Sequence, residues 1–127
     1  MYDFPSIDEV HEMLEEIAAE IPEYFFKELN GGIILLPEYK IHPESEDVDK
    51  LYVMGEYSRS MAGRHITIYY GSFEKVYSGA SMRIIRNKLK DTLLHEFTHH
   101  LESLAGERGL EIKDYNDIQE YKRRIKE

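Results

Sequence analysis

Apolar positions in the first part of the chain recur at helical spacing. From Ser6 onward they return every three or four residues, which forms one stripe of an amphipathic helix. Ser6 and Glu9 form a capping box that predicts where this helix begins. Pro22 predicts a second short helix, which the paired Gly31 and Gly32 end. The stripe consists of Ile7, Val10, Leu14, Ile17 and Ile21.

The pattern then changes to short runs typical of strands. Residues 32–41 begin with an apolar run, closed by Pro37, that is typical of a buried strand. A polar acidic loop over 42–50 follows it. The first strand is therefore expected to end near the proline.

Two further runs, 51–57 and 64–73, are rich in β-branched and aromatic residues. The segment between them contains Gly63, which predicts an antiparallel pair joined by a turn. Together with the first strand, these runs predict a three-stranded sheet, with a fourth strand left open.

The last part of the chain returns to helical spacing. A helical turn is expected around 73–77, and Ser81 predicts the start of a long helix that runs to about Leu104. Residues 114–127 predict a polar helix with basic residues near its end. The fold class is therefore expected to be α+β, a small mixed sheet packed with helices. The spine of the long helix is Ile85, Leu89, Leu93, Phe97, Leu101 and Leu104.

Size and charge narrow the classes of function. A chain of 127 residues fits a single domain, residues 1–127, with one core. Its formal charge of -9 repels phosphate backbones and anionic lipid, so neither nucleic acid nor a membrane is an expected partner. Without cysteine, a metal would be held by histidine and carboxylate. The start lacks signal-peptide features, and a cytoplasmic location is expected.

The long helix carries the pattern His-Glu-x-x-His at His95, Glu96 and His99. Two histidines four residues apart stand one turn above each other on one helix face, so both can reach one ion. Zinc is the expected ion, because it accepts imidazole and carboxylate and can keep a position for water. Glu96 would flank the ion as general base for that water.

The apolar spine gives an independent check on this face. At about 100° per residue, Phe97 and Leu101 lie roughly 160 to 240° around the helix from His95, whereas His99 lies about 40° from it. The two histidines therefore point away from the core. His100 falls near the spine, which predicts a packed or supporting histidine and not a ligand.

A catalytic zinc site needs a third protein ligand. Glu102 shares the face of the two histidines but is limited by reach along the helix axis. Gly106 predicts a turn that ends the helix and brings Glu107 back to the ion. Glu107 is the expected ligand, and Glu111 and Asp114 are later options.

At these residues the chain resembles the small zincin-like metallopeptidases of bacteria. The resemblance covers nearly the whole chain, including "PEYFFKELNGGIILLPE" and "HITIYYGSF" ahead of "TLLHEFTHHLESLAGER". It implies a minimal zincin-like fold in which His95 and His99 bind the metal and Glu96 is the general base. Many members continue with Gly and Asp where this chain has Glu102 and Ala105, so Gly106 and Glu107 look like a displaced equivalent.

The resemblance also implies a sheet edge beside the metal, where an extended peptide adds as a strand. The strand over 64–73 is the candidate edge, and Tyr69 or Tyr70 a candidate oxyanion donor, although packing is the more common role of such residues. His11, His42 and His65 are isolated in the sequence and are given no chemistry.

These observations predict a zinc-dependent peptidase that hydrolyses peptide or protein substrates. One alternative is a non-catalytic, metal-stabilised binding module in which a fourth protein ligand closes the zinc site. A metal-free interaction domain with a vestigial motif is a third. The sequence does not decide the oligomeric state or the substrate.

Overall fold

The computed structural model describes residues 3–45 and 51–108, apart from the side chains of 107 and 108. Its first helix, α1 (Ile7–Glu20), begins at the predicted capping box, where Ser6 Oγ accepts the Glu9 N–H at 3.2 Å. The Glu9 carboxylate accepts the Ser6 N–H at 3.1 Å in return. The second predicted helix is only one 3-10 turn, η1 (Glu23–Phe26).

The predicted three-stranded sheet is confirmed. It consists of β1 (Gly32–Leu36), β4 (Gly55–Ser60) and β5 (Gly63–Tyr69), in the order β1-β5-β4. β1 pairs with β5 in parallel, and β4 pairs with β5 antiparallel, so the sheet is mixed. β5 therefore lies in the centre, and β4 lies at an edge.

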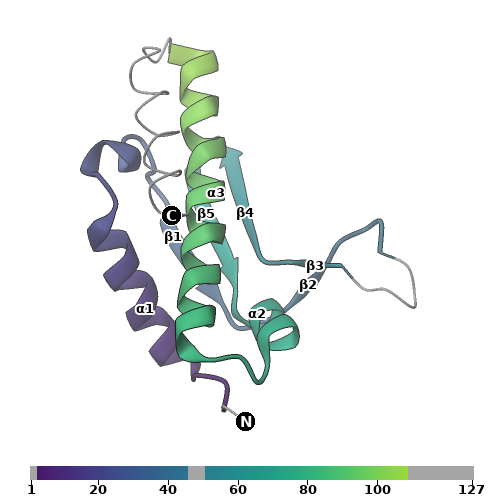
Figure 1. The fold of residues 1–127 in the computed structure, drawn as a ribbon. Helices are drawn as coiled ribbons and strands as arrows, with labels where there is room; N and C mark the ends of the chain where they lie inside the picture. Colours follow the sequence, from purple (N-terminus) through teal and green to yellow (C-terminus); the bar gives the residue numbers. More distant parts are fainter. Residues whose placement is uncertain (1–2, 46–50, 109–127) are drawn as a thin grey trace.

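Among the described residues, no fourth strand joins this sheet, and a separate two-stranded sheet lies beside it. β2 (Lys40–Ile41) pairs antiparallel with β3 (Tyr52–Val53), and the pair projects to one side of the molecule (Figure 1). β1 ends just before Pro37, as expected. The run 51–57 is divided between β3 and β4.

Two helices follow the sheet, α2 (Tyr70–Tyr77) and α3 (Met82–Arg108). α2 begins directly after β5, so the strand predicted to run to residue 73 ends at Tyr69. Gly71 lets the start of α2 lie directly against the backbone at Glu38, because a Cβ there would lie 2.6 Å from the Glu38 backbone carbon. Ser81 caps α3 as predicted, and its Oγ accepts the Ile84 N–H at 3.3 Å.

α3 crosses one face of the sheet with α1 beside it, which gives an α+β fold (Figure 1). Its predicted apolar spine is buried throughout and forms the centre of the core with residues of α1 and β5. Among the described residues, no helix combines the length and the apolar character that a membrane crossing requires. The buried spine is Ile85, Leu89, Leu93, Phe97, Leu101 and Leu104.

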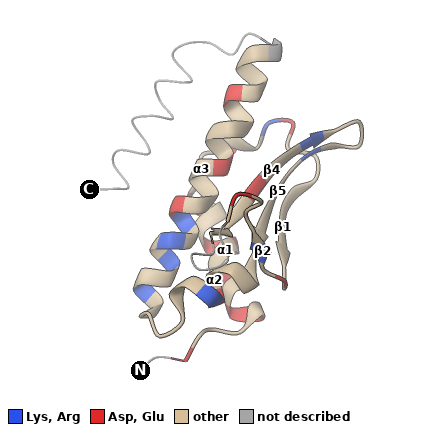
Figure 2. Cartoon of the chain, turned by 90° about the vertical axis from the view of Figure 1, so that its right-hand side faces the viewer, with Lys and Arg blue, Asp and Glu red and all other residues tan. Residues whose placement is uncertain are grey.

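Charged residues are unevenly distributed along α3, and basic residues are concentrated in its first half (Figure 2). Arg86 lies 3.4 Å from Glu16 and 3.6 Å from Glu20, and Lys90 lies 3.1 Å from Glu20. These exposed ion pairs join α3 to the acidic surface of α1. Each contributes at most about 1 kcal/mol to the free energy of unfolding. The candidate site lies in the second half of α3.

Candidate metal centre

His95 and His99 lie one turn apart on α3, and both side chains are exposed. Their Nε2 atoms converge to 3.1 Å, a distance that also suits a hydrogen bond between the two rings. Two nitrogens bound to one tetrahedral zinc ion, each at 2.0–2.1 Å, would lie about 3.3 Å apart. The pair therefore has the spacing of two ligands on one ion without rearrangement of the helix.

Glu96 differs from its neighbours because it is only 6% exposed. Burial raises the pKa of its carboxyl group above the ordinary value, and the nearby charge of Glu56 adds to this. The His99 side chain and a hydrogen bond from the Tyr57 backbone act in the opposite direction. Glu96 lies next to the two candidate ligands, and burial makes its ionised form less stable. Its carboxylate is therefore suited to accept a proton.

The three residues line an open cleft of about 810 Å³ between α3 and β4. This corrects the expectation that the strand over 64–73 provides the edge beside the metal, because β5 is central and β4 forms the wall. The lining residues are Gly55, Glu56, Tyr57 and Arg59 from β4 and His95, Glu96, His99, Glu102 and Ser103 from α3.

The hydrogen-bond pattern of the β4–β5 hairpin determines which backbone groups face the cleft. Ser60 pairs with Gly63 across a two-residue loop, and the Tyr69 N–H donates to the Met54 carbonyl at 3.0 Å. Antiparallel pairs alternate, so even-numbered residues of β4 bond to β5, and the N–H and C=O groups of odd-numbered residues point outward. The Tyr57 N–H is one of these groups, which agrees with its bond to Glu96.

The odd-numbered residues of β4 also contact α3 along its length. A Cβ on Gly55 would lie 2.9 Å from Thr92 Cγ2, so this glycine permits the close approach of strand and helix. Further along, an Arg59 nitrogen donates to Ser103 Oγ at 3.1 Å. Strand and helix therefore run side by side, with the cleft at their junction.

His100 is fully buried, as its position near the apolar spine predicts. Its Nδ1 lies 2.9 Å from the Tyr57 hydroxyl, and its Nε2 lies 2.7 Å from the Lys27 carbonyl oxygen. Burial lowers the pKa of its imidazole, as does the charge of Arg64, whereas the bond to Lys27 and the charge of Glu28 raise it. His100 is a supporting residue and does not point at the cleft.

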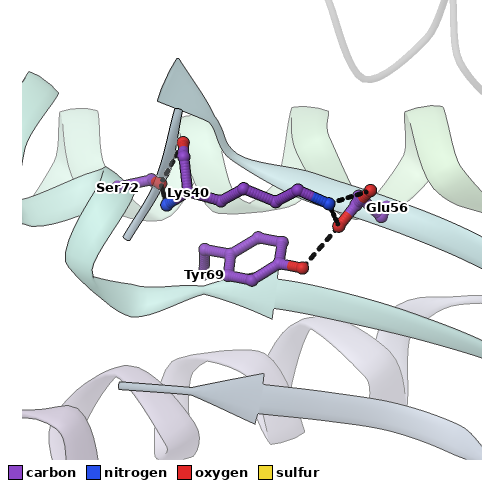
Figure 3. A network of polar contacts seen from close by, with 4 residues as sticks. All are labelled: Lys40, Glu56, Tyr69 and Ser72. Carbon is purple, nitrogen blue, oxygen red and sulfur yellow. Dashed lines mark hydrogen bonds and ion pairs between the residues drawn. The ribbon is translucent and has the colours of Figure 1, made fainter. Parts of the chain in front are cut away.

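Glu56 is held by a network of its own (Figure 3). Lys40 Nζ lies 2.8 Å from both carboxylate oxygens, and the Tyr69 hydroxyl donates to one of them. Burial opposes ionisation, but the hydrogen bonds from Lys40 and Tyr69 and the Lys40 charge together lower the pKa of Glu56. Burial and Glu56 raise the pKa of Tyr69 to about 12, so its hydroxyl stays protonated. Ser72 Oγ accepts the Lys40 backbone N–H at 3.1 Å.

Neither tyrosine suggested as an oxyanion donor points its hydroxyl into the cleft. Tyr69 is bonded to Glu56, and the Tyr70 hydroxyl donates to the Pro5 carbonyl at 2.6 Å. Tyr70 packs against the core, with its ring centroid 5.5 Å from that of Phe4, whereas Tyr69 belongs to the polar network of Glu56. Of the isolated histidines, His11 lies 3.1 Å from Glu15 on α1, away from the cleft.

The turn predicted at Gly106 is wrong, because α3 continues through this residue to Arg108. In a straight helix, position 107 is about 12 Å along the axis from position 99. The turn by which Glu107 was expected to reach the histidines is therefore absent, while Glu107 as the third ligand stays a prediction.

The other candidates for the third ligand divide into two groups. Glu102 lines the cleft. Glu111 and Asp114 lie outside the described residues. Among the described side chains, which do not include that of Glu107, no three histidine or carboxylate groups are arranged to hold a metal ion. The described part of the chain thus provides two ligand positions and an adjacent base.

Replacing Gly106 with alanine tests the helical assignment. In a helix, with no atom within 4 Å of the added Cβ, alanine should stabilise the protein by about 0.5–1 kcal/mol. In a left-handed turn the same change would destabilise it. Urea unfolding of Gly106→Ala and of the wild type gives the sign of the change in stability. A lower unfolding midpoint for the variant would contradict the helical assignment and support a left-handed turn at Gly106.

Sequence reasoning missed the contribution of β4. Glu56 stands alone as an acid in the run "LYVMGEY", which is the only signal that could have singled it out. Tyr57 gives no such signal, because its partner His100 is 43 residues away. Both were interpreted only as parts of a strand.

Comparison with solved structures finds the same fold in a bacterial relative. A conserved hypothetical protein from Thermus thermophilus has 35% sequence identity and a TM-score of 0.69. The match covers 80% of this chain and 99% of the other. The chain belongs to the same family as that protein. No protein-family model and no curated protein matches the chain.

Proposed function

We propose that the protein is a zinc-dependent peptidase with a minimal zincin-like active site. The observation that carries the proposal is the convergence of the His95 and His99 Nε2 atoms to 3.1 Å, next to the buried carboxylate of Glu96. These two imidazoles would hold the ion, with a third ligand from Glu102 or from the chain beyond residue 108. The absence of cysteine suits a cytoplasmic location.

The residues of the cleft supply the remaining parts of a hydrolytic reaction. A bound zinc ion contributes Lewis acidity, which promotes deprotonation of water and polarises a carbonyl group. Glu96 accepts the proton of the attacking water and returns it to the leaving amine nitrogen. Its burial favours the protonated form, so the carboxyl group can act in both steps.

An extended peptide is the substrate that the cleft wall suits best. The outward N–H and C=O groups of Gly55 lie along the outer edge of β4, where a peptide can add as another strand. Tyr57, two residues further along the strand, uses its N–H to bond Glu96. A bound peptide would therefore lie along β4 with one peptide bond next to Glu96.

Hydrolysis of a mixed library of fluorescence-quenched peptides by the zinc-loaded protein tests this proposal. We expect cleavage that a chelator removes and added zinc restores. Zinc binding without cleavage of any peptide would instead support a structural zinc site in a binding module.

The metal ligands can be tested independently of activity. Zinc at one hundred times its dissociation constant should stabilise the wild-type protein by about 2.7 kcal/mol, because it binds the folded state, and His99→Ala should lose this effect. Thermal unfolding with and without zinc measures it. His11→Ala, which removes an exposed histidine of α1, should keep the full shift. Equal shifts in the two variants would exclude His99 as a ligand.

A further inference from the structure

Tyr57 is attached to α3 at two points. Its backbone N–H bonds the Glu96 carboxylate, and its hydroxyl lies 2.9 Å from Nδ1 of His100, one turn further along the helix. The two rings are also in contact, with centroids 5.3 Å apart. One residue of the edge strand thus connects the candidate base to a buried histidine.

The partners of His100 determine how its protons are arranged. The Lys27 carbonyl can only accept a hydrogen bond, so the Nε2 atom 2.7 Å away must carry a proton. In a neutral imidazole, Nδ1 then accepts, and the Tyr57 hydroxyl must donate to it. Both ring nitrogens of His100 therefore have a matched partner, and His100 is anchored to Lys27, which directly follows η1.

Two other contacts between β4 and α3 are of a different kind. At Gly55 the strand touches Thr92 without a side chain of its own, and the bond from Arg59 to Ser103 is exposed to solvent. The Tyr57–His100 contact lies between them, directly above Glu96. It is the contact best placed to set the distance between the cleft walls.

We propose that Tyr57 and His100 are positioning residues, which hold the edge of β4 against α3 and so keep the Tyr57 N–H on the Glu96 carboxylate. The catalytic consequence rests on the proposed peptidase function, whereas the restraint on β4 does not. His100 follows His99 directly in α3, so the same turn of helix carries a candidate ligand and the anchor of the opposite wall.

The variant Tyr57→Phe removes the hydroxyl and retains both the ring and the backbone N–H. We expect kcat per zinc-loaded molecule to fall about 10- to 100-fold, with zinc content unchanged, because Glu96 is less well oriented. Amide hydrogen exchange at residue 57 should become faster, since β4 is held less firmly. A loss of folded protein alone would lower the amount of active enzyme but not this kcat.

Tyr70→Phe is the matched control, because it removes the hydroxyl of a tyrosine bonded to a backbone carbonyl away from the cleft. It should leave kcat and the exchange rate at residue 57 unchanged. Unaltered exchange at residue 57 in folded Tyr57→Phe would overturn the positioning role. If the wild type cleaves no peptide, the peptidase proposal fails, but the exchange measurement still decides whether Tyr57 restrains β4.

Discussion

The variant Glu96→Gln is expected to bind zinc as the wild type does and to hydrolyse peptides about 10²- to 10⁴-fold more slowly. Glutamine has nearly the same shape and can still accept the Tyr57 N–H, but it cannot take up a proton. His95 and His99 are unchanged, so the metal affinity should be retained. Peptide hydrolysis and elemental analysis of the same preparation measure both properties.

The control for this variant is Glu12→Gln, which neutralises an exposed carboxylate on α1. It should match the wild type in both measurements. Full activity in Glu96→Gln, purified free of other peptidases, would show that Glu96 is not the general base. Loss of zinc from that variant would instead give Glu96 a part in holding the metal.

Replacing Phe97 with alanine should have the largest effect on stability, about 3–5 kcal/mol. Phe97 is fully buried, with ring centroids 6.0 Å from Phe25 and 4.9 Å from Phe26. It joins α3 to the η1 segment on the side of the helix opposite the histidines. Because a domain of this size is stable by about 5–15 kcal/mol, the variant should lose a large part of its stability.

Denaturant unfolding of Phe97→Ala and Ile84→Ala checks this prediction. Ile84 lies on the same helix but is 42% exposed, so its truncation should cost less than about 1 kcal/mol. Similar losses in the two variants would mean that Phe97 does not anchor α3 in the core.

Helices were predicted well because their signals are local. The capping box at Ser6 and the apolar spine of α3 are properties of neighbouring residues, and both lie where the pattern places them. The end of α3 was missed because Gly106 is a common stop signal, and a helix tolerates one glycine at a cost of about 1 kcal/mol.

The order of the strands in the sheet was predicted less well from the sequence than the positions of the helices. The family resemblance implied that β5 is an edge strand, yet Ile66, Thr67 and Ile68 are all buried, as in a central strand with neighbours on both sides. That burial depends on β1 and β4, which pair with it from different parts of the chain. Strand order is therefore a tertiary property.

The residues of the candidate site on α3 were predicted from the sequence, whereas those on β4 were not. The local pattern gave His95, Glu96 and His99, which line one cleft. The opposite wall at Glu56 and Tyr57 depends on the docking of β4 against α3, for which the sequence holds no local signal. Glu107 as the third ligand stays a prediction, but the turn at Gly106 on which it relied is not made by α3.

The separation of the two walls along the chain has a consequence for biosynthesis. Tyr57 meets His100 across 43 residues, and the hairpin that carries Tyr57 is translated before α3. Closing a loop of that length costs entropy before the contact between the two residues repays it, and both walls of the cleft can be present only after α3 has been synthesised. A nascent chain that has completed the hairpin therefore has one wall of the cleft and none of the histidines of α3.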